Sequence, residues 1–207
     1  MCLIDQTHVN RPLNQMSRVS LTQQVHQTLL PRFRPGCIAI DATAGNGFDT
    51  LFLALHIGEN GSVFAFDIQQ QAIENTRKRL SDAGVMDRVA LICDGHESMT
   101  SHIPKALHGL VDIILFNLGY LPKADKSVIT QEPTTLQALK SALKLLAKEG
   151  YISILAYPGH PGGREETESV KSWARTLSKT SYTVCIHEPA TIGGTSPEWI
   201  EIISVAE

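Results

Sequence analysis

The residues with the clearest chemical meaning in this sequence are 38–47, which read IAIDATAGNG. An apolar run ends in Asp41 and passes directly into a loop of small residues that contains Gly45 and Gly47. Glycine lets the backbone come close to a ligand, and ligands of parallel α/β sheets lie at the carboxyl end of a strand beside a helix N-terminus. The stretch therefore predicts a first strand that leads into a nucleotide-contacting turn.

Three more polar residues follow apolar runs that are typical of strands. Asp67 ends the second run, 26 residues after Asp41, where an acidic side chain can accept hydrogen bonds from two ribose hydroxyls. Asp94 ends the third run, where an adenine edge usually lies in such sheets, and Asn117 ends the fourth. Four strand ends at one edge of a sheet predict one site for a nucleoside.

The glycine loop does not complete the dinucleotide motif GxGxxG, because Thr50 stands at the position of the third glycine. That glycine is where a pyrophosphate approaches the helix, so its absence argues against NAD. S-adenosylmethionine has no phosphate and carries a positive charge on sulfur, which suits Asp41 beside the loop. The residues favour S-adenosylmethionine, and an NAD-binding or non-enzymatic Rossmann module is the weaker alternative.

Apolar periodicity predicts the elements that must position these residues. Seven strands are expected, at residues 37–41, 63–67, 88–93, 111–116, 150–157, 182–188 and 199–205. Five helices are expected, at residues 17–30, 48–57, 69–83, 132–147 and 164–178. The first helix has Ser17 as its expected N-cap. Strands that alternate with helices of this length indicate βαβ units and a parallel sheet.

The end of the chain departs from that alternation. The last two expected strands are separated only by a loop with Gly193, Gly194 and Pro197, so they form an antiparallel hairpin. Five parallel strands followed by a hairpin are typical of class I methyltransferases. We expect an α/β, Rossmann-like fold of this class. Its seven-stranded, mostly parallel sheet has the order 3-2-1-4-5-7-6, with the last strand antiparallel and helices on both faces.

Length and composition limit the remaining choices. The chain has 207 residues, 43% of them hydrophobic, which predicts one domain over 1–207 with an irregular segment at 1–16. A net charge of −3 argues against a uniformly basic surface but leaves room for a local basic patch. No metal site is expected, and Cys37, Cys93 and Cys185 should be buried, reduced thiols. Without a membrane-spanning run or a signal pattern, a cytoplasmic enzyme is expected.

Four stretches carry a resemblance to a known family, namely DATAGNGFDTLFLA, FNLGYLPKADK, TTLQAL and AYPGHPGG. Together they resemble the bacterial family first labelled "putative rRNA methylase", over nearly the whole chain. Its characterised members are similar to tRNA wobble-uridine methyltransferases. These use S-adenosylmethionine to convert 5-aminomethyl-2-thiouridine at tRNA position 34 into the 5-methylaminomethyl form. The family usually has glycine after NLGYLP, whereas this chain has Lys123 and Ala124.

The resemblance implies a substrate and a set of site residues. A tRNA anticodon loop is the implied substrate, with rRNA or a small amine as alternatives, and a homodimer is the implied assembly. Cofactor contacts are expected from the strand-end loops, at Asp41, Thr43, Gly45, Asn46, Gly47, Asp49, Thr50, Asp67, Ile68, Gln69, Asp94, Gly95, His96, Asn117 and Gly119. The expected reaction centre comprises Asn117, Tyr120, Asp125 and His160. The expected RNA contacts are Tyr120, Lys123, Lys126 and Arg164.

Methyl transfer to an amine sets the roles of these residues. The protein must hold the nucleophile, the methyl carbon and the sulfur in line, and the amine attacks only when neutral. Asn117 is the expected orienting group, because its side-chain carbonyl can accept from the amine N–H. Tyr120 can stack on the uracil ring. Asp125, His160 or water is the candidate proton acceptor, although His160 could equally serve only to fix its loop.

Overall fold

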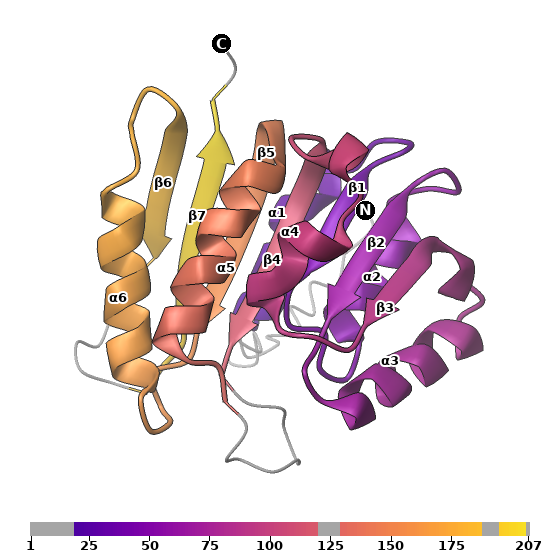
Figure 1. The fold of residues 1–207 in the computed structure, drawn as a ribbon, viewed down its shortest axis with the longest axis horizontal. Helices are drawn as coiled ribbons and strands as arrows, with labels where there is room; N and C mark the ends of the chain where they lie inside the picture. The colour runs from indigo at the N-terminus through magenta and orange to yellow at the C-terminus, as the bar shows by residue number, and fades with distance from the viewer. Residues whose placement is uncertain (1–18, 120–128, 188–194, 206–207) are drawn as a thin grey trace, which may run out of the picture.

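A single seven-stranded sheet forms the centre of the computed structural model, which describes residues 19–119, 129–187 and 195–205. Its strands run in the order β3-β2-β1-β4-β5-β7-β6 (Figure 1). Only the pairs of β7 with β5 and with β6 are antiparallel, so the predicted topology is confirmed. The strands are β1 Ile38–Asp41, β2 Ser62–Phe66, β3 Val89–Ile92, β4 Val111–Leu118, β5 Leu146–Ala156, β6 Tyr182–His187 and β7 Glu198–Ser204.

Helices cover both faces of this sheet, as predicted. In Figure 1, α5 and α6 lie on the near side of the sheet, and α1 and α2 lie on the far side. The α-helices are α1 Leu21–Leu29, α2 Phe48–His56, α3 Gln70–Asp82, α4 Met99–His102, α5 Glu132–Leu145 and α6 Gly163–Arg175. The shorter 3-10 turns are η1 Leu30–Arg32, η2 Met86–Arg88, η3 His96–Ser98 and η4 Lys105–Leu107.

The core is split into two layers by the sheet, because successive strand residues point to opposite faces. Along β1, Ala39 packs in the layer that contains Leu29 of α1 and Leu53 of α2. Ile40 packs in the other layer, together with Leu139 of α5. All five side chains are fully buried. Helix stripes on both faces therefore fix how the central strands are placed.

The order of the strands places a ligand crevice beside β1 and β4. From β1 the chain moves outward through β2 and β3, and from β4 it moves the other way through β5. Asp41 at the end of β1 pairs with Leu115 of β4, and β4 continues to Asn117. In doubly wound sheets, ligands bind outside the carboxyl ends of the strands at such a reversal point. The predicted strand-end residues therefore lie at the edge of the sheet where ligands of such folds bind.

Several local predictions were wrong. The N-cap of α1 is Ser20, whose hydroxyl accepts from the Gln23 N–H, while Gln23 bonds back to the Ser20 N–H in a capping box. Ser17 lies outside the described residues. The predicted helix 132–147 ends at residue 145, because Leu146 already pairs with Val111 in the sheet.

The connection from β3 to β4 agrees with expectation, whereas two of the thiols do not. Between β3 and β4 no long helix was predicted, and short turns and the four-residue α4 make the crossover. Cys37 is buried as expected, but Cys93 and Cys185 are exposed. Cys185 faces outward because β6 is an edge strand with alternating exposure. Within the described residues, no helix is both long and apolar enough to cross a membrane.

Candidate functional site

A large open cavity of about 1560 Å³ lies along the carboxyl ends of the strands. Its walls come from the loop after β1, the ends of β2, β3, β4 and β5, and the first turns of α1. Twelve of the predicted cofactor residues line it: Thr43, Gly45, Asn46, Asp49, Asp67, Ile68, Gln69, Asp94, Gly95, His96, Asn117 and Gly119. One cavity thus brings together side chains that are distant in the sequence.

Other predicted site residues do not line this cavity. Asp41, Gly47 and Thr50 lie behind its wall, and Arg164 is exposed at the start of α6. His160 does line the cavity, with its Nδ1 atom 3.0 Å from the Pro161 carbonyl oxygen. Four further predicted residues fall outside the described residues, namely Tyr120, Lys123, Asp125 and Lys126.

Asp41 supports the glycine loop from below. Its carboxylate accepts from the Thr50 hydroxyl at 2.6 Å and from the Thr43 N–H at 3.2 Å, and the residue is fully buried. Burial, followed by the negative charge of Asp49, raises the pKa of Asp41 to about 7. Its position follows from strand alternation, because Asp41 lies on the same face of β1 as Ala39, toward α2.

Helix α3 holds the glycine loop from outside. The Thr76 hydroxyl donates to the Gly45 carbonyl at 3.0 Å, and the Arg79 Nε donates to the Asn46 carbonyl at 2.7 Å. Gly47 has a φ of +75°, and a Cβ there would lie 2.8–2.9 Å from atoms of Thr76. Only glycine combines this left-handed backbone with so close an approach. The Arg79 guanidinium also lies over the Phe48 ring, 3.7 Å from its centroid.

Asp67 connects the second strand end to the same loop. Its carboxylate accepts from the Gly45 N–H and from the Gln69 N–H, both at 2.9 Å. Burial raises the pKa of Asp67, and these two hydrogen bonds act in the opposite direction. Each carboxylate oxygen retains a further acceptor position. Asp67 can therefore accept from ligand hydroxyls while it keeps the loop in place.

The third strand end carries one charged and one neutral group. Asp94 accepts from His102, from the Gly95 N–H and from the Ser98 hydroxyl, and these interactions, His102 first, lower its pKa. His96 is buried, and burial lowers its pKa, which favours the neutral imidazole. A charged carboxylate beside a buried neutral ring can recognise the polar edge and the face of a base.

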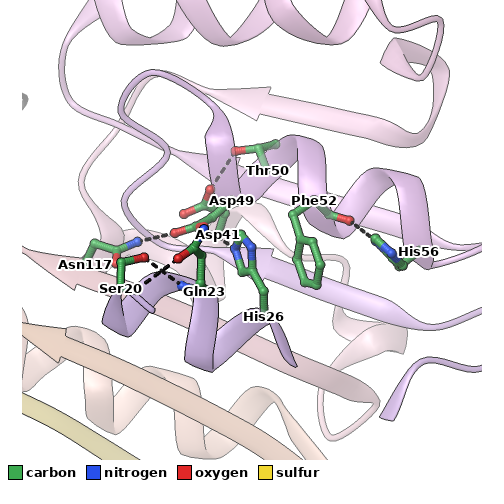
Figure 2. A network of polar contacts seen from close by, with 9 residues as sticks. All are labelled: Ser20, Gln23, His26, Asp41, Asp49, Thr50, Phe52, His56 and Asn117. Carbon is green, nitrogen blue, oxygen red and sulfur yellow. Dashed lines mark hydrogen bonds and ion pairs between the residues drawn. The ribbon is translucent and has the colours of Figure 1, made fainter. Parts of the chain in front are cut away.

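A network of polar contacts surrounds Asn117 at the end of β4 (Figure 2). The Asn117 side-chain amide donates to Asp49 Oδ2 at 2.6 Å, and Asp49 Oδ1 lies 2.6 Å from His26 Nε2. The Asn117 backbone N–H donates to the Thr43 hydroxyl at 2.7 Å. The side chains of Asn117, Asp49 and His26 come from β4, α2 and α1, and all three line the cavity.

Sequence reasoning missed the contribution of the first helix. The N-cap Ser20 and Thr22, Gln23 and His26 of α1 line the cavity, and so does Tyr157, which follows β5. Burial raises the pKa of this tyrosine. The Ser-x-x-Gln capping box is a sequence signal for where α1 begins. It carries no information about where the helix docks.

A second group of polar side chains lies on the outer strands, away from the cavity. The potential ligand atoms of Cys185, His187 and Glu201 lie within 4.8 Å of one another. His187 Nε2 is 2.5 Å from Glu201 Oε2, and the Tyr151 hydroxyl donates to Glu201 Oε1 at 2.6 Å. The Trp199 ring stacks on His187 with a centroid distance of 4.5 Å. These contacts tie together strands β5, β6 and β7.

Comparison with known sequences shows which family the chain resembles. The family described as "Putative rRNA methylase" matches residues 63–202 of the chain. A chloroplastic tRNA (mnm(5)s(2)U34)-methyltransferase of Arabidopsis thaliana is 40% identical over 176 residues, which are 81% of this chain. The chain spans 64% of that relative's length.

Solved structures show the same relationship. A "putative rRNA-methylase" from Clostridium thermocellum is 39% identical with a TM-score of 0.85, covering 90% of this chain and 98% of that chain. A putative methyltransferase from Streptococcus mutans, in complex with SAH, is 34% identical with a TM-score of 0.79, covering 92% of this chain and 100% of that chain. The strand order, the strand-end cavity and these matches together show that the chain belongs to the family described as "Putative rRNA methylase".

Proposed function

We propose that this chain is an S-adenosylmethionine-dependent methyltransferase that N-methylates the aminomethyl group of 5-aminomethyl-2-thiouridine at the tRNA wobble position. The observation that carries the proposal is the Asn117 amide, which lines the strand-end cavity and is fixed by Asp49 at 2.6 Å. The name of the 40% identical Arabidopsis relative supports the choice of substrate.

The residues of the cavity fit this cofactor. Asp67 accepts from two backbone N–H groups and has acceptor positions left for ribose hydroxyls. His96 and Ile68 offer a buried neutral ring and an exposed apolar side chain near an acidic strand end. Asp41, buried behind the cavity wall, brings acidic character to the glycine loop, which suits a cationic cofactor. The donor set therefore suits a cationic nucleoside without phosphate.

When bound, S-adenosylmethionine supplies a methyl group on a sulfonium: the nitrogen–carbon bond forms as the carbon–sulfur bond breaks, the bonding pair stays on sulfur, and one proton leaves the amine. Asn117 accepts an N–H hydrogen bond from the neutral amine and so directs the nitrogen lone pair. His160, which also lines the cavity, or a water molecule takes the released proton. The protein mainly holds the reactants in line.

A tRNA anticodon loop is the proposed partner. RNA binding needs local positive charge, and Arg164 is exposed at the start of α6, close in sequence to the cavity residue His160. Lys123 and Lys126, which lie outside the described residues, are proposed as further phosphate contacts. The homodimer also stays a proposal, which light scattering of the purified protein will test.

The test is a methylation assay on defined RNA. The protein is incubated with S-adenosylmethionine and tRNA that carries 5-aminomethyl-2-thiouridine, and the nucleosides are then analysed by mass spectrometry. We expect one added methyl group at that nucleoside and none on the same tRNA with unmodified uridine. Ribosomal RNA in a parallel reaction tests the alternative substrate. Protein that binds the cofactor in calorimetry but leaves the tRNA unchanged would contradict the proposed substrate.

A further inference from the structure

The carboxylate of Asp49 is shared between two side chains from different parts of the chain. One oxygen accepts from the Asn117 side-chain amide at 2.6 Å, and the other lies 2.6 Å from His26 Nε2. The side chain of Asp49 is 12% exposed and that of His26 is 23% exposed, so water competes little for these contacts. Figure 2 shows the three side chains in a row, from α1 through α2 to the end of β4.

This arrangement determines which way the Asn117 amide faces. A carboxylate only accepts hydrogen bonds, so the NH₂ side of the amide must face Asp49. The amide oxygen lies on the other side of the planar group and is left for the cavity that Asn117 lines. The Asn117 backbone is held separately, by its N–H donating to the Thr43 hydroxyl at 2.7 Å. Without Asp49, the side chain could rotate and present a donor instead of an acceptor.

His26 in turn fixes Asp49. Its ring stacks on Phe52 with a centroid distance of 3.8 Å and an interplanar angle of 2°. Its helix is anchored by Val25 and Leu29, which are buried in the core layer on that face. Asp49 also lies in the first turn of α2, where the helix dipole favours a negative charge. The carboxylate is therefore held in one orientation from both sides.

We propose that Asp49 and His26 are positioning residues that set the Asn117 amide with its oxygen toward the amine of the substrate. The inference rests on the proposed function for the identity of that amine. Through His26, α1 then helps to position a residue of the reaction centre. Asp49 then also has a role that differs from the cofactor contact expected from sequence. A cofactor contact would raise the KM for S-adenosylmethionine, whereas a positioning role lowers kcat.

The variants separate the hydrogen bonds from the packing. Asp49→Ala removes the shared carboxylate. His26→Phe keeps a ring against Phe52 but removes the donor, and His26→Gln restores a donor near the position of Nε2. His56→Phe is the matched control, because His56 also lies against Phe52, at 4.5 Å, but does not line the cavity (Figure 2).

The first readout does not depend on any RNA substrate. In ¹⁵N–¹H spectra, the Asn117 side-chain NH₂ signals are identified by their loss in Asn117→Ala. We expect these signals to shift and to exchange faster with solvent in Asp49→Ala and His26→Phe. They should be unchanged in His56→Phe and close to wild type in His26→Gln. NH₂ signals that stay at their wild-type shifts in folded Asp49→Ala would overturn the proposal.

The second readout is the steady-state kinetics of methylation of the modified tRNA, which gives kcat and the KM for S-adenosylmethionine. We expect kcat to fall about 100-fold in Asp49→Ala and about tenfold in His26→Phe, since a misplaced reacting group can cost about 100-fold in rate. The KM for S-adenosylmethionine should stay within about twofold, and His26→Gln should recover most of kcat. A large rise in that KM with unchanged kcat would overturn the positioning role. Wild-type protein that does not methylate the tRNA contradicts the proposed function alone, and the spectra then still decide the positioning role.

Discussion

Replacing Asp41 by asparagine should make the ligand-free protein more stable at alkaline pH. Asp41 is fully buried, and its pKa is raised from an ordinary 3.8 to about 7. Asparagine has nearly the same shape. Its oxygen can still accept from the Thr43 N–H, while the Thr50 hydroxyl can turn to accept from the new NH₂ group. The variant therefore removes a charge and keeps the local hydrogen bonds.

The magnitude and its pH dependence follow from that pKa. Between about pH 4 and pH 7 the folded protein binds more protons at Asp41 than the unfolded chain does. The free energy of unfolding therefore falls as pH rises through this window. A shift of about 3 pKa units corresponds to roughly 4 kcal/mol as an upper limit. Relative to wild type, Asp41→Asn should gain on the order of 2–4 kcal/mol at pH 8 and close to nothing at pH 4.

Urea unfolding followed by circular dichroism at several pH values between 4 and 8 measures this difference. The control is Asp82→Asn, which removes an exposed carboxylate paired with Lys78 on α3 and should change stability by less than about 1 kcal/mol at any pH. The reasoning is refuted if the difference between Asp41→Asn and wild type does not grow with pH. It is also refuted if the variant is the less stable protein at pH 8.

Three further variants test single contacts. Gly47→Ala should lower the free energy of unfolding by about 2 kcal/mol more than Gly36→Ala in urea titrations. Both positions have positive φ, but only at Gly47 would a Cβ meet other atoms within 4 Å. Glu166→Ala should lower the free energy of unfolding by about 2 kcal/mol, because the hydroxyls of Thr130 and Thr135 lose their acceptor. Glu165→Ala, at an exposed position, should change it by less than about 0.5 kcal/mol, and equal effects of the two variants would contradict this. Asp67→Ala should weaken S-adenosylmethionine binding about 10- to 100-fold in calorimetry, and an unchanged Kd would remove its assigned role.

Much of the fold could be predicted because its signals are local. Strand and helix periodicity located all seven strands and five of the helices, and the short gap before β7 gave the hairpin. The start of β5 could not be found in this way. Leu146 and Ala147 continue the apolar stripe of α5, but pairing with Val111 draws the backbone into the sheet. Tertiary contacts override local propensity at such positions.

The residues of the candidate site fall into the same two groups, those that local sequence signals predict and those that depend on tertiary contacts. The position of Asp67, Asp94 and Asn117 at the cavity could be predicted, because the end of a strand is a local feature and parallel strands bring their carboxyl ends to one edge. The contact between His26 and Asp49 could not be found, because it depends on how two helices dock on the sheet. That Asp41 lies behind the cavity wall could have been predicted from the sequence, because side chains alternate between the two faces of β1 and this places Asp41 on the face toward α2.

Binding of a cationic cofactor should release protons from the carboxyl group of Asp41 beneath the glycine loop. Burial and the charges of Asp49 and Asp67 raise the pKa of Asp41 to about 7, so near neutral pH this carboxyl is about half protonated. A bound sulfonium would favour the ionised form and release up to about half a proton at pH 7. Calorimetric titration with S-adenosylmethionine should therefore give a binding enthalpy that differs between buffers of high and low ionisation enthalpy. Asp41→Asn should abolish that difference, and a wild-type enthalpy independent of buffer would mean that Asp41 does not sense the ligand charge.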